Sequence, residues 1–99
     1  MLVSEERRLK LVLYVSPTSA ASARARRNLD GLLARLADPH VDLDVRDVSE
    51  DTAAAEADRI LFTPTLVVRQ PIRSWIVGDL GNADEVLNLL RLAETEATT

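Results

Sequence analysis

Three consecutive segments in the first half of the chain alternate between the hydrophobic periods of a strand and a helix, and this pattern constrains the fold most. Residues 9–15 form an almost unbroken apolar run, which is typical of a strand covered on both faces. Residues 20–37 carry leucines at helical spacing, at positions 29, 32, 33 and 36. Residues 41–46 alternate apolar and charged side chains, which predicts a strand with one solvent-exposed face. Strand, helix and strand in this order predict a βαβ unit with a right-handed crossover.

The second half of the chain predicts a helix, two strands and a final helix. Ser49 and the acids after it begin a helix over residues 49–61, whose apolar face is thin and mostly alanine. Residues 65–68 and 72–77 have the composition of strands. Asn82 and Glu85 resemble a capping box for a helix that continues to residue 93.

These elements follow one another in the order β-α-β-α-β-β-α, which is the order of a thioredoxin-like α/β domain. The chain has 99 residues, enough for one domain of this kind, and we assign residues 1–99 to it. The polar ends, residues 1–8 and 94–99, are expected to be frayed.

The Thr63-Pro64 step stands directly before the third predicted strand, where thioredoxin-like folds place a structural proline. We therefore expect a cis bond at Pro64, the alternative being a trans proline that merely starts a strand. The chain has no cysteine, and the loop that would carry a reactive pair reads Ser16-Pro17-Thr18-Ser19. Because the thiolate is the nucleophile of thioredoxin chemistry, we expect a binding protein with no catalytic residues and no cofactor.

Composition excludes several other classes of protein. The net charge of −4 argues against a nucleic-acid partner, and no stretch approaches the roughly 20 apolar residues of a membrane span. The first ten residues lack the apolar core of a signal peptide, so we expect a cytoplasmic protein. Asp42 and Asp44 share one face of their strand and Asp47 lies on the other, which predicts a hydrated surface and not a metal site. His40 is read as a solvated loop residue.

Read along its length, the chain resembles the KaiB family of circadian-clock proteins. The order and spacing of several short segments carry the resemblance: Leu13-Tyr14-Val15, Arg24-Ala25, Asp47-Val48, Asp58-Arg59-Ile60-Leu61, Thr63-Pro64-Thr65-Leu66, Pro71, Arg73, Gly78-Asp79-Leu80 and Glu85-Val86-Leu87. The resemblance implies two folds of similar free energy. One is a thioredoxin-like monomer that binds the hexameric ATPase KaiC. The other is a ground state in which the C-terminal half is arranged differently and the chain associates with itself, as a dimer or tetramer.

The resemblance also implies which residues carry the function. Arg24, Arg59 and Arg73 stand where the family keeps basic residues, which makes them candidate contacts to the ATPase; the alternative for Arg24 and Arg59 is a solvated helix face. The residues assigned to the structural or switching part of the chain are Pro64, Pro71, Gly78 and Asp79.

Two departures from the family pattern concern a third clock protein. Val12 and Asp44 stand at strand positions where the family commonly carries lysine, and Asp44 falls on the edge that the resemblance assigns to KaiA. Because a reversed charge weakens steering and complementarity, we do not expect a KaiA-like partner. Trp75 is either a core residue or a subunit contact.

The sequence therefore predicts a non-enzymatic regulatory protein that binds a KaiC-like ATPase and modulates its timing or output. One alternative is a redox-inactive adaptor for another partner, such as a sensor kinase or a stress pathway. The other is a glutathione-using thioredoxin relative.

Overall fold

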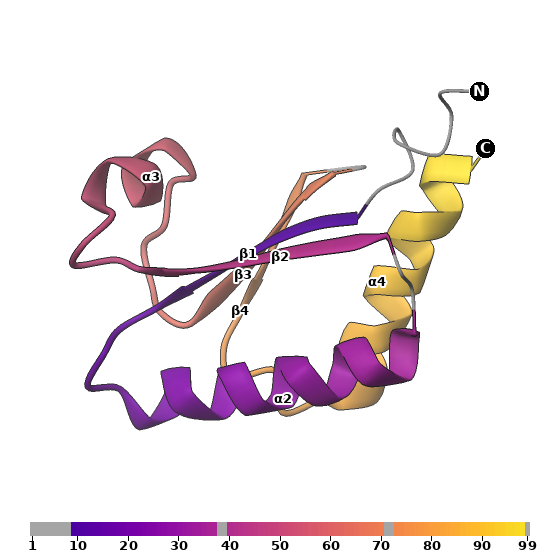
Figure 1. Ribbon diagram of the computed structural model, residues 1–99, viewed down its shortest axis with the longest axis horizontal. Helices are drawn as coiled ribbons and strands as arrows, with labels where there is room; N and C mark the ends of the chain where they lie inside the picture. The colour runs from indigo at the N-terminus through magenta and orange to yellow at the C-terminus, as the bar shows by residue number, and fades with distance from the viewer. Residues whose placement is uncertain (1–8, 38–39, 71–72, 99) are drawn as a thin grey trace.

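The computed structural model describes residues 9–37, 40–70 and 73–98, with only the backbone for residues 93–98. Its elements follow the predicted order: β1 (Leu9–Val15), α2 (Ala20–Leu36), β2 (Val41–Asp47), α3 (Thr52–Ala57), β3 (Thr65–Gln70), β4 (Ser74–Val77) and α4 (Ala83–Thr98). The four strands form one sheet in the order β2-β1-β3-β4 (Figure 1). β1 is parallel to β2, whereas β1 with β3 and β3 with β4 are antiparallel. The predicted thioredoxin-like arrangement is confirmed.

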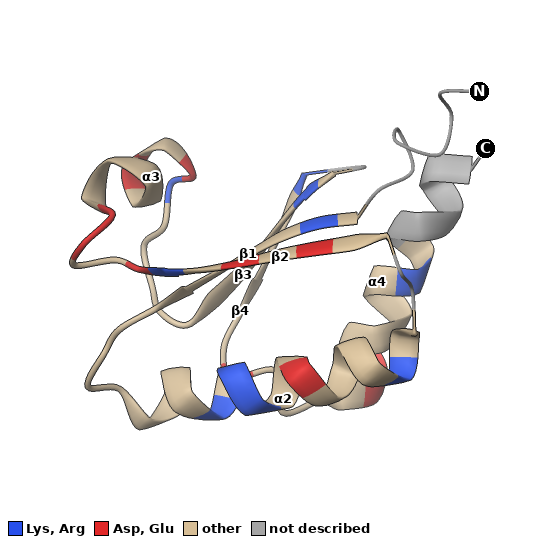
Figure 2. Cartoon of the chain, viewed as in Figure 1, with Lys and Arg blue, Asp and Glu red and all other residues tan. Residues whose placement is uncertain are grey.

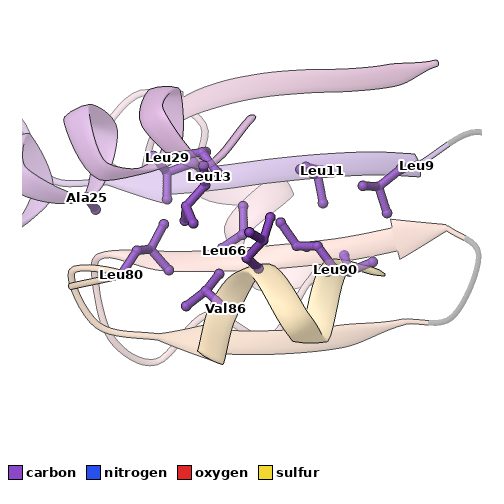
Figure 3. Close-up of a cluster of buried hydrophobic side chains, with 12 residues drawn as sticks. Leu9, Leu11, Leu13, Ala25, Leu29, Leu66, Leu80, Val86 and Leu90 are labelled. Carbon is purple, nitrogen blue, oxygen red and sulfur yellow. The ribbon is translucent and has the colours of Figure 1, made fainter. Parts of the chain in front are cut away.

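The main core lies between the sheet and the two long helices. The alternate side chains Leu9, Leu11 and Leu13 of β1 point to this face, where Leu29 of α2 and Leu90 of α4 meet them (Figure 3). All five are at most 2% exposed. This face is therefore covered by leucine and valine side chains from two helices, as the helical leucine pattern predicted.

The opposite face of the sheet has a smaller apolar cluster. Val12 and Tyr14 of β1 and Val67 of β3 point to this side, where Ala55 of α3 packs on them. α3 has six residues and Ala55 is its one buried side chain, so it covers little of the sheet. In Figure 1, α3 lies beyond one end of the strands, on the side of the sheet away from α2. Polar side chains complete the cover of this face, and they form the site described below.

Several element boundaries differ from the sequence prediction. α3 begins at Thr52, with Asp51 and not Ser49 at its N-cap, since the Ser49 hydroxyl donates to Asp47 Oδ1 at 2.6 Å. α3 ends at Ala57 and not at Leu61, because Asp58 turns inward and Arg59 adopts a left-handed φ of 57°. β3 continues to Gln70, two residues past the predicted end at Val68. α4 extends to Thr98, since alanine and glutamate in this polar segment favour the helix. The predicted frayed start at residues 1–8 lies outside the described residues, as do Pro71 and Ile72.

Candidate partner-binding surface

A buried carboxylate organises the thinly covered face of the sheet. Asp58 follows α3 directly and is 2% exposed. Its Oδ2 accepts hydrogen bonds from the Tyr14 hydroxyl at 2.5 Å and from Arg69 Nη2 at 2.6 Å. Its Oδ1 accepts a hydrogen bond from Arg73 Nη2. The backbone carbonyl of the same residue accepts a hydrogen bond from Trp75 Nε1 at 2.8 Å. One residue thus joins β1, β3 and the approach to β4.

The ionisation of these groups follows from their contacts. Burial acts to raise the pKa of Asp58, but the hydrogen bonds from Tyr14 and Arg69 and the charges of both arginines lower it below its usual value. The Tyr14 hydroxyl has a raised pKa, because burial and the neighbouring carboxylate both oppose its ionisation. The hydrogen bond to Asp58 raises the pKa of Arg69. Asp58 is therefore an anion held by two cations, and the three together keep a net positive charge.

Two of the three predicted contact arginines lie together beside this carboxylate. Arg59, Arg73, Trp75 and Ala57 line a hollow of about 320 Å³. The guanidinium of Arg73 lies over the ring of Trp75, with its Cζ 5.6 Å from the ring centroid, a cation–π geometry. Trp75 is 43% exposed, so it is neither a core residue nor fully solvated. A tryptophan and two arginines that line one hollow are a composition typical of protein interfaces.

Arg24, the third predicted contact arginine, lies elsewhere. It belongs to α2, which covers the other face of the sheet, and its Nε lies 3.1 Å from Asp79 Oδ2 in an exposed ion pair. Figure 2 shows basic positions on both long helices, on β1 and β2, in the segment after α3 and in the β3–β4 hairpin. The hollow formed by Arg59, Arg73 and Trp75 therefore does not include Arg24.

Three of the four residues assigned to the structural or switching part, Pro64, Gly78 and Asp79, lie together where β4 ends. The Thr63–Pro64 bond is cis, which confirms the prediction for this proline. The carbonyl of Pro64 accepts a hydrogen bond from the Gly78 N–H at 2.9 Å, and Gly78 has a φ of 116°, a value that favours glycine. Asp79 fixes the next turn: its carboxylate also accepts from the Gly81 N–H at 2.9 Å, and its carbonyl accepts from Asn28 Nδ2 at 2.7 Å. Its pKa is lowered by the Arg24 and Gly81 hydrogen bonds. The predicted Pro71 lies outside the described residues.

Hydroxyl groups occupy the loop in which a redox protein would carry its thiols. Ser16 Oγ and Thr63 Oγ1 are hydrogen-bonded at 2.7 Å. Ser19 caps α2 by accepting the Ser22 N–H at 3.1 Å. These hydroxyls hold the loop to the cis-proline segment and begin the helix. In the described part of the chain, no acidic and histidine side chains are grouped as a metal site. None of the described helices has the length and apolar content to cross a bilayer.

Sequence reasoning missed the centre of the site. Asp58 was noted only within a matching segment, and Tyr14 and Arg69 received no role. The available signal was a tyrosine within the otherwise apolar β1, since a buried hydroxyl needs a hydrogen-bond partner from another part of the chain. Leu61, predicted to end the helix, lies instead in the loop after α3, where it is 84% exposed and its neighbour Phe62 is 67% exposed.

The mixed sheet, the cis proline and the helix-covered face define a thioredoxin-like domain. Chloroplastic thioredoxin z shares the fold with a TM-score of 0.76 and 17% identity, over 95% of this chain and 85% of that chain. The N-terminal domain of Synechococcus elongatus SasA has a TM-score of 0.74 and 25% identity, over 90% of this chain and 85% of that chain.

The family is defined by sequence. The KaiB domain model matches residues 12–92. The circadian clock oscillator protein KaiB of Thermostichus vulcanus is 40% identical over 79 residues, which cover 78% of this chain and 72% of the relative. The protein of the same name from a Cyanothece species is 38% identical over 94 residues, which cover 88% and 89%. The chain belongs to the KaiB family, as its motifs predicted.

Proposed function

We propose that this chain is a non-enzymatic regulatory protein that binds a hexameric KaiC-like ATPase and modulates its timing or output. Membership in the KaiB family supports this role, because the relatives are circadian clock oscillator proteins. The observation that carries the proposal is the hollow lined by Arg59, Arg73 and Trp75, an interface-type surface on a thioredoxin-like scaffold that has no thiol.

In this proposal the thioredoxin-like arrangement is the form that binds. A KaiB-type ground state, with a different C-terminal half and a dimeric or tetrameric assembly, is the second form of the chain and does not bind the ATPase. Only the competent fraction can bind, so the complex accumulates slowly and the apparent affinity falls by that fraction. A KaiA-like protein is not a partner in this proposal. The β2 edge carries Asp44, which is held by Arg46 at 2.9 Å, where the family commonly has a cation.

The test is complex formation with a purified hexameric KaiC-like ATPase and ATP, followed by size-exclusion chromatography over many hours. We expect slow appearance of a large complex with the wild-type chain. Arg59→Glu and Arg73→Glu should each weaken the complex, whereas Arg35→Glu should not. Arg35 is a matched control, because it is also an exposed arginine in an ion pair but lies at the end of α2. Equal binding by all variants, or no complex at any time, contradicts the proposal.

Arg24→Glu tests whether the contact extends to α2. Arg24 is half exposed, and its ion pair with Asp79 is a surface pair that contributes less than about 1 kcal/mol to folding. Weaker binding by a folded Arg24→Glu variant would therefore assign Arg24 to the interface.

A redox-inactive adaptor for another partner is the second candidate. The hydrogen-bonded Ser16 and Thr63 at the thiol loop favour it, because they preserve a thioredoxin-like surface without its chemistry. Absence of a complex with the ATPase, together with capture of a different folded partner by the same Arg59 and Arg73 surface, would support this candidate.

A further inference from the structure

Asp58 is the one carboxylate that is buried among the described side chains, and its contacts come from distant parts of the sequence. Tyr14 lies 44 positions before it, and Arg69, Arg73 and Trp75 lie 11, 15 and 17 positions after it. A buried acid needs this number of donors to remain ionised. The donors are not equivalent, however, and their division between the two carboxylate oxygens indicates what each of them does.

Oδ2 receives the two donors that anchor the carboxylate. The Tyr14 hydroxyl is itself fully buried, and it lies within 3.3 Å of Arg69 Nη2, which donates to the same oxygen. These contacts hold Asp58 against the sheet. Neither Tyr14 nor Arg69 lines the hollow beside Trp75.

Oδ1 accepts a hydrogen bond from Arg73, which does line the hollow. The side chain of Arg73 is half exposed, so without a fixed partner it would sample many rotamers in water. The Asp58 carbonyl holds the indole N–H of Trp75, and the Arg73 guanidinium lies over the Trp75 ring. The side chain and the backbone of Asp58 therefore fix Arg73 and Trp75, two of the three large side chains that line the hollow. A surface that is fixed before binding loses less conformational entropy when a partner arrives.

We propose that Asp58 is the positioning residue of the partner-binding surface: it holds Arg73 and Trp75 in the geometry that the partner contacts, without contacting the partner itself. This inference rests on the proposed function, and it adds a division of labour within the site. Tyr14 and Arg69 hold Oδ2 against the sheet, whereas Oδ1 and the backbone carbonyl of Asp58 hold Arg73 and Trp75. Loss of one anchor leaves the other donor on Oδ2 and should reduce stability alone, whereas loss of the Asp58 carboxylate should reduce both stability and affinity.

The test is a double-mutant cycle read by equilibrium binding of the labelled full chain to the KaiC-like hexamer with ATP. Arg73→Gln and Asp58→Asn should each weaken binding by about tenfold or more, the usual effect of removing an interface anchor. If Asp58 acts through Arg73, the double variant should bind no more than about twofold more weakly than Arg73→Gln. Tyr14→Phe should lower the stability but leave the affinity unchanged. Asp84→Asn, which removes an 85% exposed carboxylate, is the matched control for charge and should change neither.

A second readout uses the free protein. Trp75 is the single tryptophan of the chain, so its indole N–H gives one assignable NMR signal in the thioredoxin-like form. Asp58→Asn keeps the carbonyl that accepts this N–H but releases Arg73 from the ring, so it should shift the signal and speed its exchange with solvent. Tyr14→Phe should leave the signal near its wild-type position. If Asp58→Asn does not fold, Arg73→Lys takes its place. Lysine keeps the charge but lacks the planar fork that contacts the carboxylate and stacks on the ring, so affinity should fall as with Arg73→Gln.

Three results would overturn the inference. The first is wild-type affinity in folded Asp58→Asn or in Arg73→Lys. The second is a double variant whose loss of affinity equals the product of the two single losses. The third is an unchanged Trp75 signal in Asp58→Asn. Failure of the proposed function is a separate result, in which the wild-type chain forms no complex. In that case the Trp75 signal still decides whether Asp58 positions the surface.

Discussion

Replacing Asp58 with asparagine tests the physical basis of the whole thinly covered face. The change preserves the shape of the side chain but removes its charge. Tyr14 and Arg69 would still find an acceptor oxygen, whereas Arg73 would face an amide N–H₂ group where it now contacts Oδ1. The expected result is a large loss of stability in a domain whose fold is retained.

The magnitude follows from the contacts. A hydrogen bond to a charged group contributes about 1.5–3 kcal/mol, and a neutral one about 1 kcal/mol. The variant loses the Arg73 bond and the charge assistance of the Arg69 bond. The side chains of Arg73 and Arg69 are 50% and 38% exposed, so water can hydrate their guanidinium groups after the change. The loss of stability should therefore be smaller than the largest values for breaking a fully buried ion pair. We expect a loss of about 2–4 kcal/mol out of a total of about 5–15 kcal/mol for a domain of this size.

The assay is urea unfolding at neutral pH, followed by circular dichroism and by Trp75 fluorescence, with the melting temperature as a second measure. A loss of this size should lower the melting temperature by about 10–30 °C. Asp84→Asn is the control and should stay within about 0.5 kcal/mol of the wild type. If Asp58→Asn proves as stable as the wild type, the cost of burying the carboxylate must cancel its hydrogen bonds, and the reasoning about Asp58 is wrong.

Four further predictions concern other parts of the domain. The pKa of Asp58 is lower in the folded protein than in the unfolded chain, so its contribution to the free energy of unfolding is present above about pH 4 and is lost as the pH falls further. Urea unfolding across this range should therefore show a steeper loss of stability for the wild type than for Asp58→Asn. Ser19→Ala removes the N-cap of α2 and should cost about 1 kcal/mol in the same assay, with Ser19→Thr retaining most of the stability. Gly78→Ala meets no neighbouring atom within 4 Å but forces alanine to a φ of 116°, so it should cost about 1–3 kcal/mol in thermal unfolding, and an unchanged melting temperature would disprove the strain. Phe62→Ser removes a 67% exposed ring and should change stability by less than about 0.5 kcal/mol while lowering self-association in analytical ultracentrifugation.

The sequence predicted the α2 and α4 side of the fold well, because a single physical signal decides it. Leucines at helical spacing form one apolar face that must pack against another element, and the apolar β1 needs cover on both sides. α3 was the weak element for the same reason. Its alanines provide little apolar surface, so local hydrogen bonds decide where the helix ends. The spacing of apolar residues in the sequence does not reveal those hydrogen bonds. The buried turn at Asp58 and the left-handed Arg59 end the helix four residues before the predicted Leu61.

The candidate site could be predicted only in part. The resemblance selected Arg59 and Arg73, which do lie together, but it also selected Arg24, which lies on α2. Positions that carry the same charge in a family say nothing about which of them share a face. Asp58 was missed because its partners lie at least 11 positions away in the sequence, and no local pattern links an acid to them.

The unequal cover of the two sheet faces gives a physical reason for the place of the proposed binding surface. Two long helices bury one face, whereas the other has the six-residue α3 and the polar contacts of Asp58. A mixed sheet is most stable when both of its faces are covered. The Arg59, Arg73 and Trp75 surface adjoins the uncovered part, so a partner that binds there supplies cover that the chain itself does not provide. The same thin cover makes this face the least costly to open, because local unfolding follows the density of buried apolar contacts. We therefore expect hydrogen exchange to be fastest in α3 and the loop after it, and to slow there on binding while α2 remains unchanged.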